Sequence, residues 1–263
     1  MVETALLNWT LQQILSVVII LTRVGTIIFL MPVMGSRSVP APVKALLSLV
    51  TALTLAPVVN ADPSLLPTSG LAFTLFIIYE VGFGAILSLF ARFIFAGVET
   101  AGQMVGIQMG MGMAGVMDPQ FGEQVSIVGS FWGIIAILIF LGVNGHHIFF
   151  KTLVESFTWV APGNFQLSQA TFDGMMQGAS HMFVLAVKIM APASAAVFFS
   201  HVAMGVIAKT VPQIPILIVG MPMNIAIGFI FVGLSLGYLM PLLITNFDML
   251  GRLLPKLAMG MGG

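Results

Sequence analysis

The sequence predicts an all-α membrane protein whose chain crosses the bilayer several times. Hydrophobic residues make up 59% of the chain and charged residues only 7%, far from the composition of soluble domains. Several charge-free intervals are of membrane-spanning length. They are residues 4–22, 45–61, 63–79, 124–150, 189–208 and 210–247. Because these runs are continuously apolar rather than alternating, helices are favoured over a β-barrel.

The first predicted helix runs from Thr10 to Leu30 and ends before Pro32, which cannot continue it. It carries Arg23 in its second half, where a long side chain can snorkel to the membrane surface. Glu3 stands where a signal peptide would be positively charged, and the apolar run is too long for one, so we expect this helix to be retained. A proline-rich loop, Pro32–Lys44, follows.

The second predicted helix, Ala45–Val59, is barely long enough to cross a bilayer. Its shortness indicates a position in a shell of protein rather than in free lipid. The next segment, Asn60–Gly70, is rich in turn residues and predicts a loop.

A long third helix is predicted over Leu71–Thr100, and it carries Glu80, Arg92 and Glu99. Charged side chains are costly in hydrocarbon. They indicate either a proton or ion path or a set of ion pairs that fixes an assembly, and the second interpretation is favoured. Arg92 and Glu99 share a helix face but are separated by about 10 Å of helical rise, so each needs a partner from another helix or subunit.

The stretch Gly102–Gln124 combines glycine with methionine in a way that the rest of the chain does not. Glycine lets the backbone bend or approach another chain closely, and methionine adapts its shape to different neighbours. We therefore predict a non-helical insert at membrane depth that acts as a soft seal. The alternative is an ordinary membrane helix rich in small residues.

A fourth apolar helix is predicted over Val125–Val143, and Asn144-Gly145 predicts a turn after it. His146 and His147 follow, but adjacent side chains point to different helix faces and no HExxH pattern or cysteine accompanies them, so a metal site is disfavoured. A shorter helix, Ile148–Trp159, then carries Lys151 and Glu155 one turn apart. This spacing favours a local ion pair.

The polar segment Ala161–Thr171 is the clearest candidate boundary in the chain. Beyond it, Phe172–Ala208 and Pro215–Asp248 predict two long helices joined by a short turn, an antiparallel hairpin. Prolines within both arms predict kinks; they are Pro192, Pro222 and Pro241. Lys188 and His181 share a face of the first arm.

Composition and motifs disfavour several functional classes. Zero net charge with scattered basic residues gives no reason to expect nucleic-acid binding, and the chain has no cysteine. Ser130 with His146 or His147 is the only arrangement that resembles a hydrolase, and it completes no motif. No phosphate-binding loop is present in the sequence. We therefore predict a protein that is not an enzyme and that uses no cofactor or metal.

Taken in order, the motifs resemble the FliR/SpaR/SctT family of flagellar and virulence type III secretion export gates, nearly from end to end. The residues that carry the resemblance are Arg23, Gly25, Pro32, Pro40, Pro42, Lys44, Glu80, Gly84, Ala101, Gly102, Asp118, Pro119, Asn144, Gly145, His146, His147, Ala191, Pro192, Gly205, Lys209, Pro212, Gln213, Gly220, Pro222 and Gly228. The chain has Ile214-Pro215 where the family usually has Met-Asn.

The resemblance implies a structural pore subunit that assembles with FliP, FliQ and FlhB and passes unfolded flagellar proteins across the bacterial inner membrane. It implies a FliP-like part, residues 1–164, and a FliQ-like hairpin, residues 165–263, with some of the assembly raised to the periplasmic side of the flagellar basal body. It also implies that the loop 106–124 projects into the lumen as a plug.

The predicted plug residues are Gly106, Met109, Gly110, Met111, Gly112, Met113, Met117, Asp118, Pro119 and Phe121. The predicted buried charges at assembly contacts are Arg23, Glu80, Arg92, Glu99 and Lys188. The alternative function is a proton-coupled secondary transporter that uses Glu80, Glu99 and the histidines.

Overall fold

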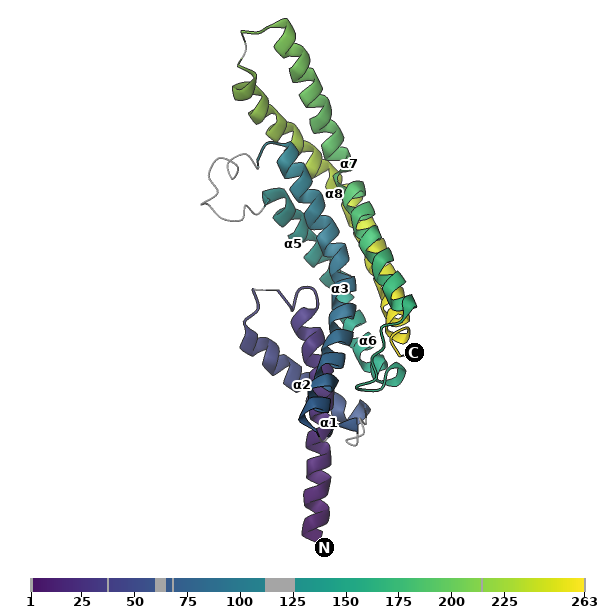
Figure 1. The fold of residues 1–263 in the computed structure, drawn as a ribbon. Coiled ribbons are helices and arrows are strands. Elements are labelled where there is room, and N and C mark those ends of the chain that lie inside the picture. Colours follow the sequence, from purple (N-terminus) through teal and green to yellow (C-terminus); the bar gives the residue numbers. More distant parts are fainter. Residues whose placement is uncertain are drawn as a thin grey trace. The chain divides into compact units, whose positions relative to one another are not determined.

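The computed structural model of the chain is all-α, as the sequence predicts (Figure 1). It describes residues 2–36, 38–59, 65–67, 69–111, 126–213 and 215–262, and these ranges contain no strand. The helices are α1 (Val2–Leu30), α2 (Ala41–Val59), α3 (Gly70–Gln108), α5 (Ile127–Gly142), α6 (Gly145–Trp159), α7 (Gln169–Thr210) and α8 (Ile216–Met259).

Three helix boundaries differ from the prediction in ways that matter for function. Helix α1 begins at Val2 rather than Thr10. Helix α2 begins at Ala41 rather than Ala45, because Pro42 is tolerated in the first turn of a helix. Helix α3 continues to Gln108. The prediction that the glycine-methionine stretch is non-helical from Gly102 onward is therefore wrong for Gly102–Gln108.

Five helices are long and apolar enough to cross a membrane: α1, α2, α3, α7 and α8. Helices α5 and α6 satisfy the same test together as one broken span with a bend between them. Asn144 lies at this bend in the left-handed conformation, with φ of 56°, which asparagine adopts more readily than most residues. The predicted turn at Asn144-Gly145 is confirmed.

The chain forms two compact units, and the long helices α3, α7 and α8 each contribute to both. The first unit contains Met1–Arg92, Asn144–Ala179 and Asp248–Gly263, and the second contains Phe93–Val143 and Ser180–Phe247. Both units thus draw residues from each side of position 164. The division into a FliP-like and a FliQ-like part stays a prediction.

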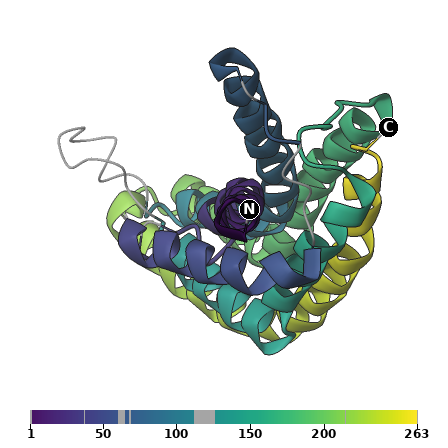
Figure 2. The same ribbon diagram turned by 90° about the horizontal axis from the view of Figure 1, so that it is seen from below.

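In the first unit, α1 and α3 meet where Gly84 leaves room for Thr26. A Cβ atom on Gly84 would stand 2.7 Å from the Thr26 Cγ2 atom. Helix α2 packs beside α1 and crosses it steeply, as Figures 1 and 2 show together. The end of the chain is fixed by the Ser168 hydroxyl, which donates to the Gly260 carbonyl over 2.6 Å.

In the second unit, the predicted antiparallel hairpin of α7 and α8 is confirmed. Two polar contacts set its register: the His181 Nε2 atom lies 2.6 Å from the Asn246 Oδ1 atom, and the Ser200 hydroxyl donates to the Asn224 Oδ1 atom over 2.6 Å. The helices continue through all three prolines at which kinks are predicted. An aromatic cluster of Phe95, Phe140 and Phe247 ties the hairpin to α3 and α5, with ring centroids 5.2 to 5.5 Å apart.

Candidate functional site

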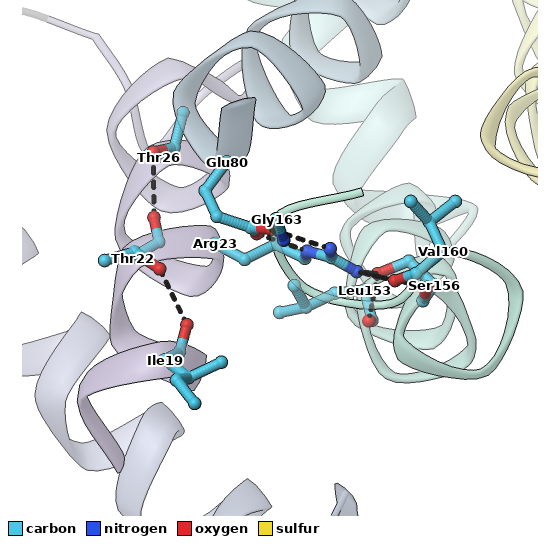
Figure 3. A network of polar contacts seen from close by, with 9 residues as sticks. All are labelled: Ile19, Thr22, Arg23, Thr26, Glu80, Leu153, Ser156, Val160 and Gly163. Atoms are coloured by element: carbon cyan, nitrogen blue, oxygen red, sulfur yellow. Dashed lines mark hydrogen bonds and ion pairs between the residues drawn. The ribbon is translucent and has the colours of Figure 1, made fainter. Parts of the chain in front are cut away.

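A buried ion pair between α1 and α3 lies in the first unit (Figure 3). The Arg23 Nε atom donates to the Glu80 Oε2 atom over 2.6 Å, and the Nη2 atom donates to Oε1 over 3.0 Å. Both side chains have 0% exposure. Such two-point contacts are the strongest arrangement of arginine and carboxylate, and an unpaired charge in the same place would be severely destabilising.

The rest of the guanidinium is also fully surrounded. Its Nη1 atom donates to the carbonyls of Ser156 and Val160, at 3.1 and 2.9 Å, where the C-terminal end of α6 carries partial negative charge. The Phe83 and Phe157 rings lie on it, each with its centroid 4.5 Å from the Arg23 Cζ atom. This cation–π contact is favourable away from water.

Glu80 is held from a second direction by the turn after α6. The Gly163 N–H donates to the Glu80 Oε1 atom over 2.8 Å. Gly163 has φ of +79°, and a Cβ atom there would stand 2.7 Å from the Phe76 Cδ2 atom, so this position favours glycine on both grounds. The pair therefore joins α1, α3, the end of α6 and the following turn.

These contacts correct one prediction and add residues that the sequence did not indicate. Arg23 does not snorkel to a surface, because its partner Glu80 lies inside the unit. Ser156, Val160 and Gly163 are not predicted as site residues, because they contribute largely through backbone atoms, which carry no residue signature. The Pro162-Gly163 turn was the only available signal.

The other three predicted assembly contacts are exposed on this chain. Arg92 and Glu99 lie on α3, and Lys188 lies on α7. Within the described residues, none of the three has an ion-pair partner. Helices α3 and α7 are otherwise apolar enough to cross a membrane, so these charges need partners there.

The glycine-rich end of α3 lies against the start of α5 in the second unit. A Cβ atom on Gly102 would collide with the Gly129 Cα atom and would stand 2.5 Å from the Gly129 nitrogen. The Ser126 hydroxyl donates to the Gly102 carbonyl over 3.0 Å and accepts from the Gly129 N–H over 3.1 Å. Ser126 thus caps α5 and joins it to α3. Only glycine permits this contact between backbones.

Helix α3 ends in a Schellman motif at Gly110. The Met111 N–H donates to the Gly106 carbonyl and the Gly110 N–H donates to the Ile107 carbonyl, both over 3.0 Å. Gly110 has φ of +84°. This is the bonding pattern with which a left-handed glycine ends a helix, so the position of Gly110 in the sequence determines where α3 stops.

Met109 anchors this helix end to α8. Its side chain is 0% exposed and fills the space that Gly228 leaves, where a Cβ atom would stand 2.5 Å from the Met109 Cγ atom. Of the predicted plug residues, Gly106 and Met109 are therefore packing residues at the end of α3, and Gly110 is its cap. Met111 follows the cap.

The remaining predicted plug residues lie outside the residues that the structure describes. They are Gly112, Met113, Met117, Asp118, Pro119 and Phe121. The described flanks nevertheless show how this segment is attached. Met111 precedes this segment and Ser126 follows it. Each forms a hydrogen bond with the glycine-rich end of α3.

No metal-binding group of three or more histidine, cysteine or acidic side chains occurs in the part of the chain that is described. The rings of His146 and His147 lie against each other, with centroids 4.2 Å apart. Further along α6, the Lys151 Nζ atom lies 4.0 Å from the Glu155 Oε1 atom, which confirms the predicted local pair.

The sequence profile of a family described as "Bacterial export proteins, family 1" matches residues 14–250. The chain is 30% identical to the flagellar biosynthetic protein FliR of Bacillus subtilis (strain 168) over 216 residues, 81% of this chain and 82% of the relative.

Two further relatives carry the same name. The chain is 27% identical over 257 residues to the protein of Pectobacterium carotovorum subsp. carotovorum, 96% of each chain. It is 27% identical over 208 residues to the protein of Escherichia coli (strain K12), 79% of each chain.

Proposed function

The chain belongs to the bacterial export proteins, family 1, and from this membership we propose that it is a structural subunit of a flagellar protein export gate in the bacterial inner membrane. It assembles there with FliP and FliQ subunits and with FlhB, and the finished gate passes unfolded flagellar proteins. The similarity to FliR over most of the chain supports this function.

The observation that carries the proposal is the way α3 and α5 frame residues 112–125. Backbone contact at Gly102 and Gly129, the Schellman motif at Gly110 and the cap at Ser126 hold both flanks of that segment on one helix end. A gate needs a segment that closes it and a frame that holds that segment. We assign the plug to residues 106–124, with Gly106–Gly110 as its anchor and the residues from Met111 onward as the part that closes the lumen.

The composition of the plug suits a conduit that accepts chains of any sequence. Methionine side chains are apolar and adaptable, so they seal around a passing polypeptide without requiring specific hydrogen bonds. Glycines among them let the backbone change direction at little cost. Ions lose their hydration at such a seal and are excluded.

The exposed charges supply the assembly contacts of the proposed gate. Arg92, Glu99 and Lys188 are exposed on helices of spanning length, and in a gate complex each meets an opposite charge on a neighbouring subunit. Arg23 and Glu80, which pair with each other, act within the chain and fix the shape that the neighbours recognise.

Co-purification from native membranes tests the assembly. A tagged copy of this chain is expected to carry FliP and FliQ with it, and a stable monomer that takes up a small solute when reconstituted alone indicates a proton-coupled transporter instead. Deletion of Gly110–Met113 in the assembled complex tests the plug. We expect the membrane to become permeable to small ions, whereas unchanged conductance contradicts the assignment.

A further inference from the structure

Helix α2 carries its polar residues on the inside and its apolar residues on the outside. The buried residues of α2 are Lys44, Ser48 and Ala52, one turn apart, and they form a single stripe. The outer face of α2 consists of aliphatic side chains that are 41% to 65% exposed: Val43, Leu46, Leu49, Val50, Leu53 and Val58. Helix α2 crosses α1 steeply (Figures 1 and 2), and its most deeply buried residues are those of this stripe.

Three polar side chains of this helix form hydrogen bonds within the chain. The Lys44 ammonium donates to the Ser36 carbonyl over 2.8 Å and lies 5.8 Å from the centre of the Phe29 ring. The Ser48 hydroxyl donates to the Lys44 carbonyl over 2.7 Å. The exposed Thr54 hydroxyl donates to the Thr51 carbonyl of the same helix over 2.9 Å. Each of these groups thus has a hydrogen-bond partner within the chain.

We infer that the outer face of α2 contacts the acyl chains of membrane lipid in the finished complex. This face carries no charge that could pair with a charge on a protein partner. An uncharged apolar face is instead complementary to the hydrocarbon of the lipid acyl chains. Protein partners within a membrane bind through small side chains and polar contacts, and α2 has turned its small and polar stripe toward its own chain.

Helices α3, α7 and α8 provide the contrast. Helix α3 exposes Arg92 and Glu99, α7 exposes Lys188 and His201, and α8 exposes Asp248 and Arg252. These polar groups suit contact with protein or water. Among the five candidate spans, α2 also has the smallest buried share, 22%, against 50% for α3.

The length of α2 agrees with a place in hydrocarbon. The shorter helix predicted from Ala45 indicated a protein shell, but the helix begins at Ala41 and has 19 residues. At 1.5 Å of rise per residue it is about 28 Å long. The hydrocarbon layer is about 30 Å thick, so the helix fits inside that layer at any inclination.

Spin labels read by electron paramagnetic resonance test this directly, because the chain has no cysteine of its own. Leu46→Cys, Leu49→Cys and Leu53→Cys are labelled with a nitroxide in the complex with its native partners, reconstituted in phosphatidylethanolamine–phosphatidylglycerol vesicles. Phe198→Cys on α7 is the matched control, since Phe198 is 61% exposed and Leu46 is 63% exposed. All four positions are exposed, so the labels leave the core undisturbed.

We expect dissolved oxygen, which concentrates in hydrocarbon, to relax the three α2 labels several-fold more than a water-soluble nickel chelate does. The Phe198 label, covered by a neighbouring subunit, should respond weakly to both reagents. Weak responses to both reagents on α2 mean a protein cover, and a stronger response to nickel means water; either result overturns the inference. If no complex forms, the same labels on the chain alone in vesicles still test α2, so failure of the proposed assembly is distinguishable from failure of the lipid contact.

Discussion

Arg23 on α1 and Glu80 on α3 form two hydrogen bonds with each other at a place where neither side chain has any exposed surface. Lys151 and Glu155 are the second ion pair among the described residues, but they lie on the surface, with side chains 76% and 39% exposed. The two pairs thus offer the same chemistry in opposite environments.

Glu80→Gln is expected to destabilise the complex by about 3–5 kcal/mol, because it leaves the Arg23 charge buried without a partner. Glu155→Gln, the matched control, should change stability by less than about 1 kcal/mol. Thermal dissociation of the purified complex measures both. Equal effects of the two substitutions would contradict a structural role for the buried pair.

The double variant Arg23→Met/Glu80→Gln separates a structural role from a proton-carrying one. It removes both charges and keeps an oxygen to accept the Gly163 N–H, so assembly should recover relative to Glu80→Gln alone. Protein export should recover with it. If assembly returned while export stayed absent, Glu80 would carry protons rather than only fix the fold.

Gly102→Ala should destabilise the contact between α3 and α5 by about 1–3 kcal/mol, the usual cost of overpacking. The new Cβ atom collides with backbone at Gly129, and backbone cannot move aside as a flexible side chain can. Gly133→Ala in α5 is the control, since nothing lies within 4 Å of its Cβ position. It should be neutral or stabilising, because alanine favours helices more than glycine. The melting temperature of the complex reports both.

The effect of a substitution at Gly110 should increase with the free-energy cost of placing the new residue in the left-handed conformation. Asparagine tolerates this conformation, whereas alanine pays about 1–2 kcal/mol and valine more. We therefore expect ion leakage through the assembled gate to rise in the order Gly110→Asn, Gly110→Ala, Gly110→Val. Conductance across a reconstituted bilayer gives the order, and identical leakage for asparagine and valine would argue against the Schellman motif as the anchor of the plug.

Gly228→Ala should push the Met109 side chain out of its space, since the added Cβ atom would stand 2.5 Å from Cγ. The double variant Met109→Ala/Gly228→Ala removes the clash, so the two substitutions together should cost less than their sum. Gly237→Ala in the same helix, with nothing within 4 Å, is the control. Additive losses in melting temperature would show that Met109 and Gly228 do not interact.

Arg92→Ala and Glu99→Ala are each expected to lower the yield of assembled complex, because each leaves the opposite charge on a neighbouring subunit unpaired. Lys151→Ala removes an exposed charge whose partner is on the same helix and should leave the yield unchanged. Quantitative co-purification with FliP and FliQ measures all three. Normal yields for Arg92→Ala and Glu99→Ala would mean that these charges face water.

Composition and local pattern are enough to predict the all-α class, the long hairpin and the turn at Asn144-Gly145. Hydrophobic runs of spanning length need helices to satisfy their backbone in a membrane, and glycine, proline and asparagine set where those helices stop. The sequence also places charges where hydrocarbon makes them expensive. Arg23 and Glu80 are therefore conspicuous from residue type and position alone.

Tertiary packing settles which of those charges pair and how the glycines are used. Arg23 and Glu80 are 57 residues apart in sequence, and much of their surroundings is backbone, which leaves no trace in residue type. Gly102 and Gly110 look alike in the sequence, yet one permits backbone contact with α5 and the other takes the left-handed conformation that ends α3. Local pattern indicates what a residue can do, whereas only its packing neighbours determine what it does.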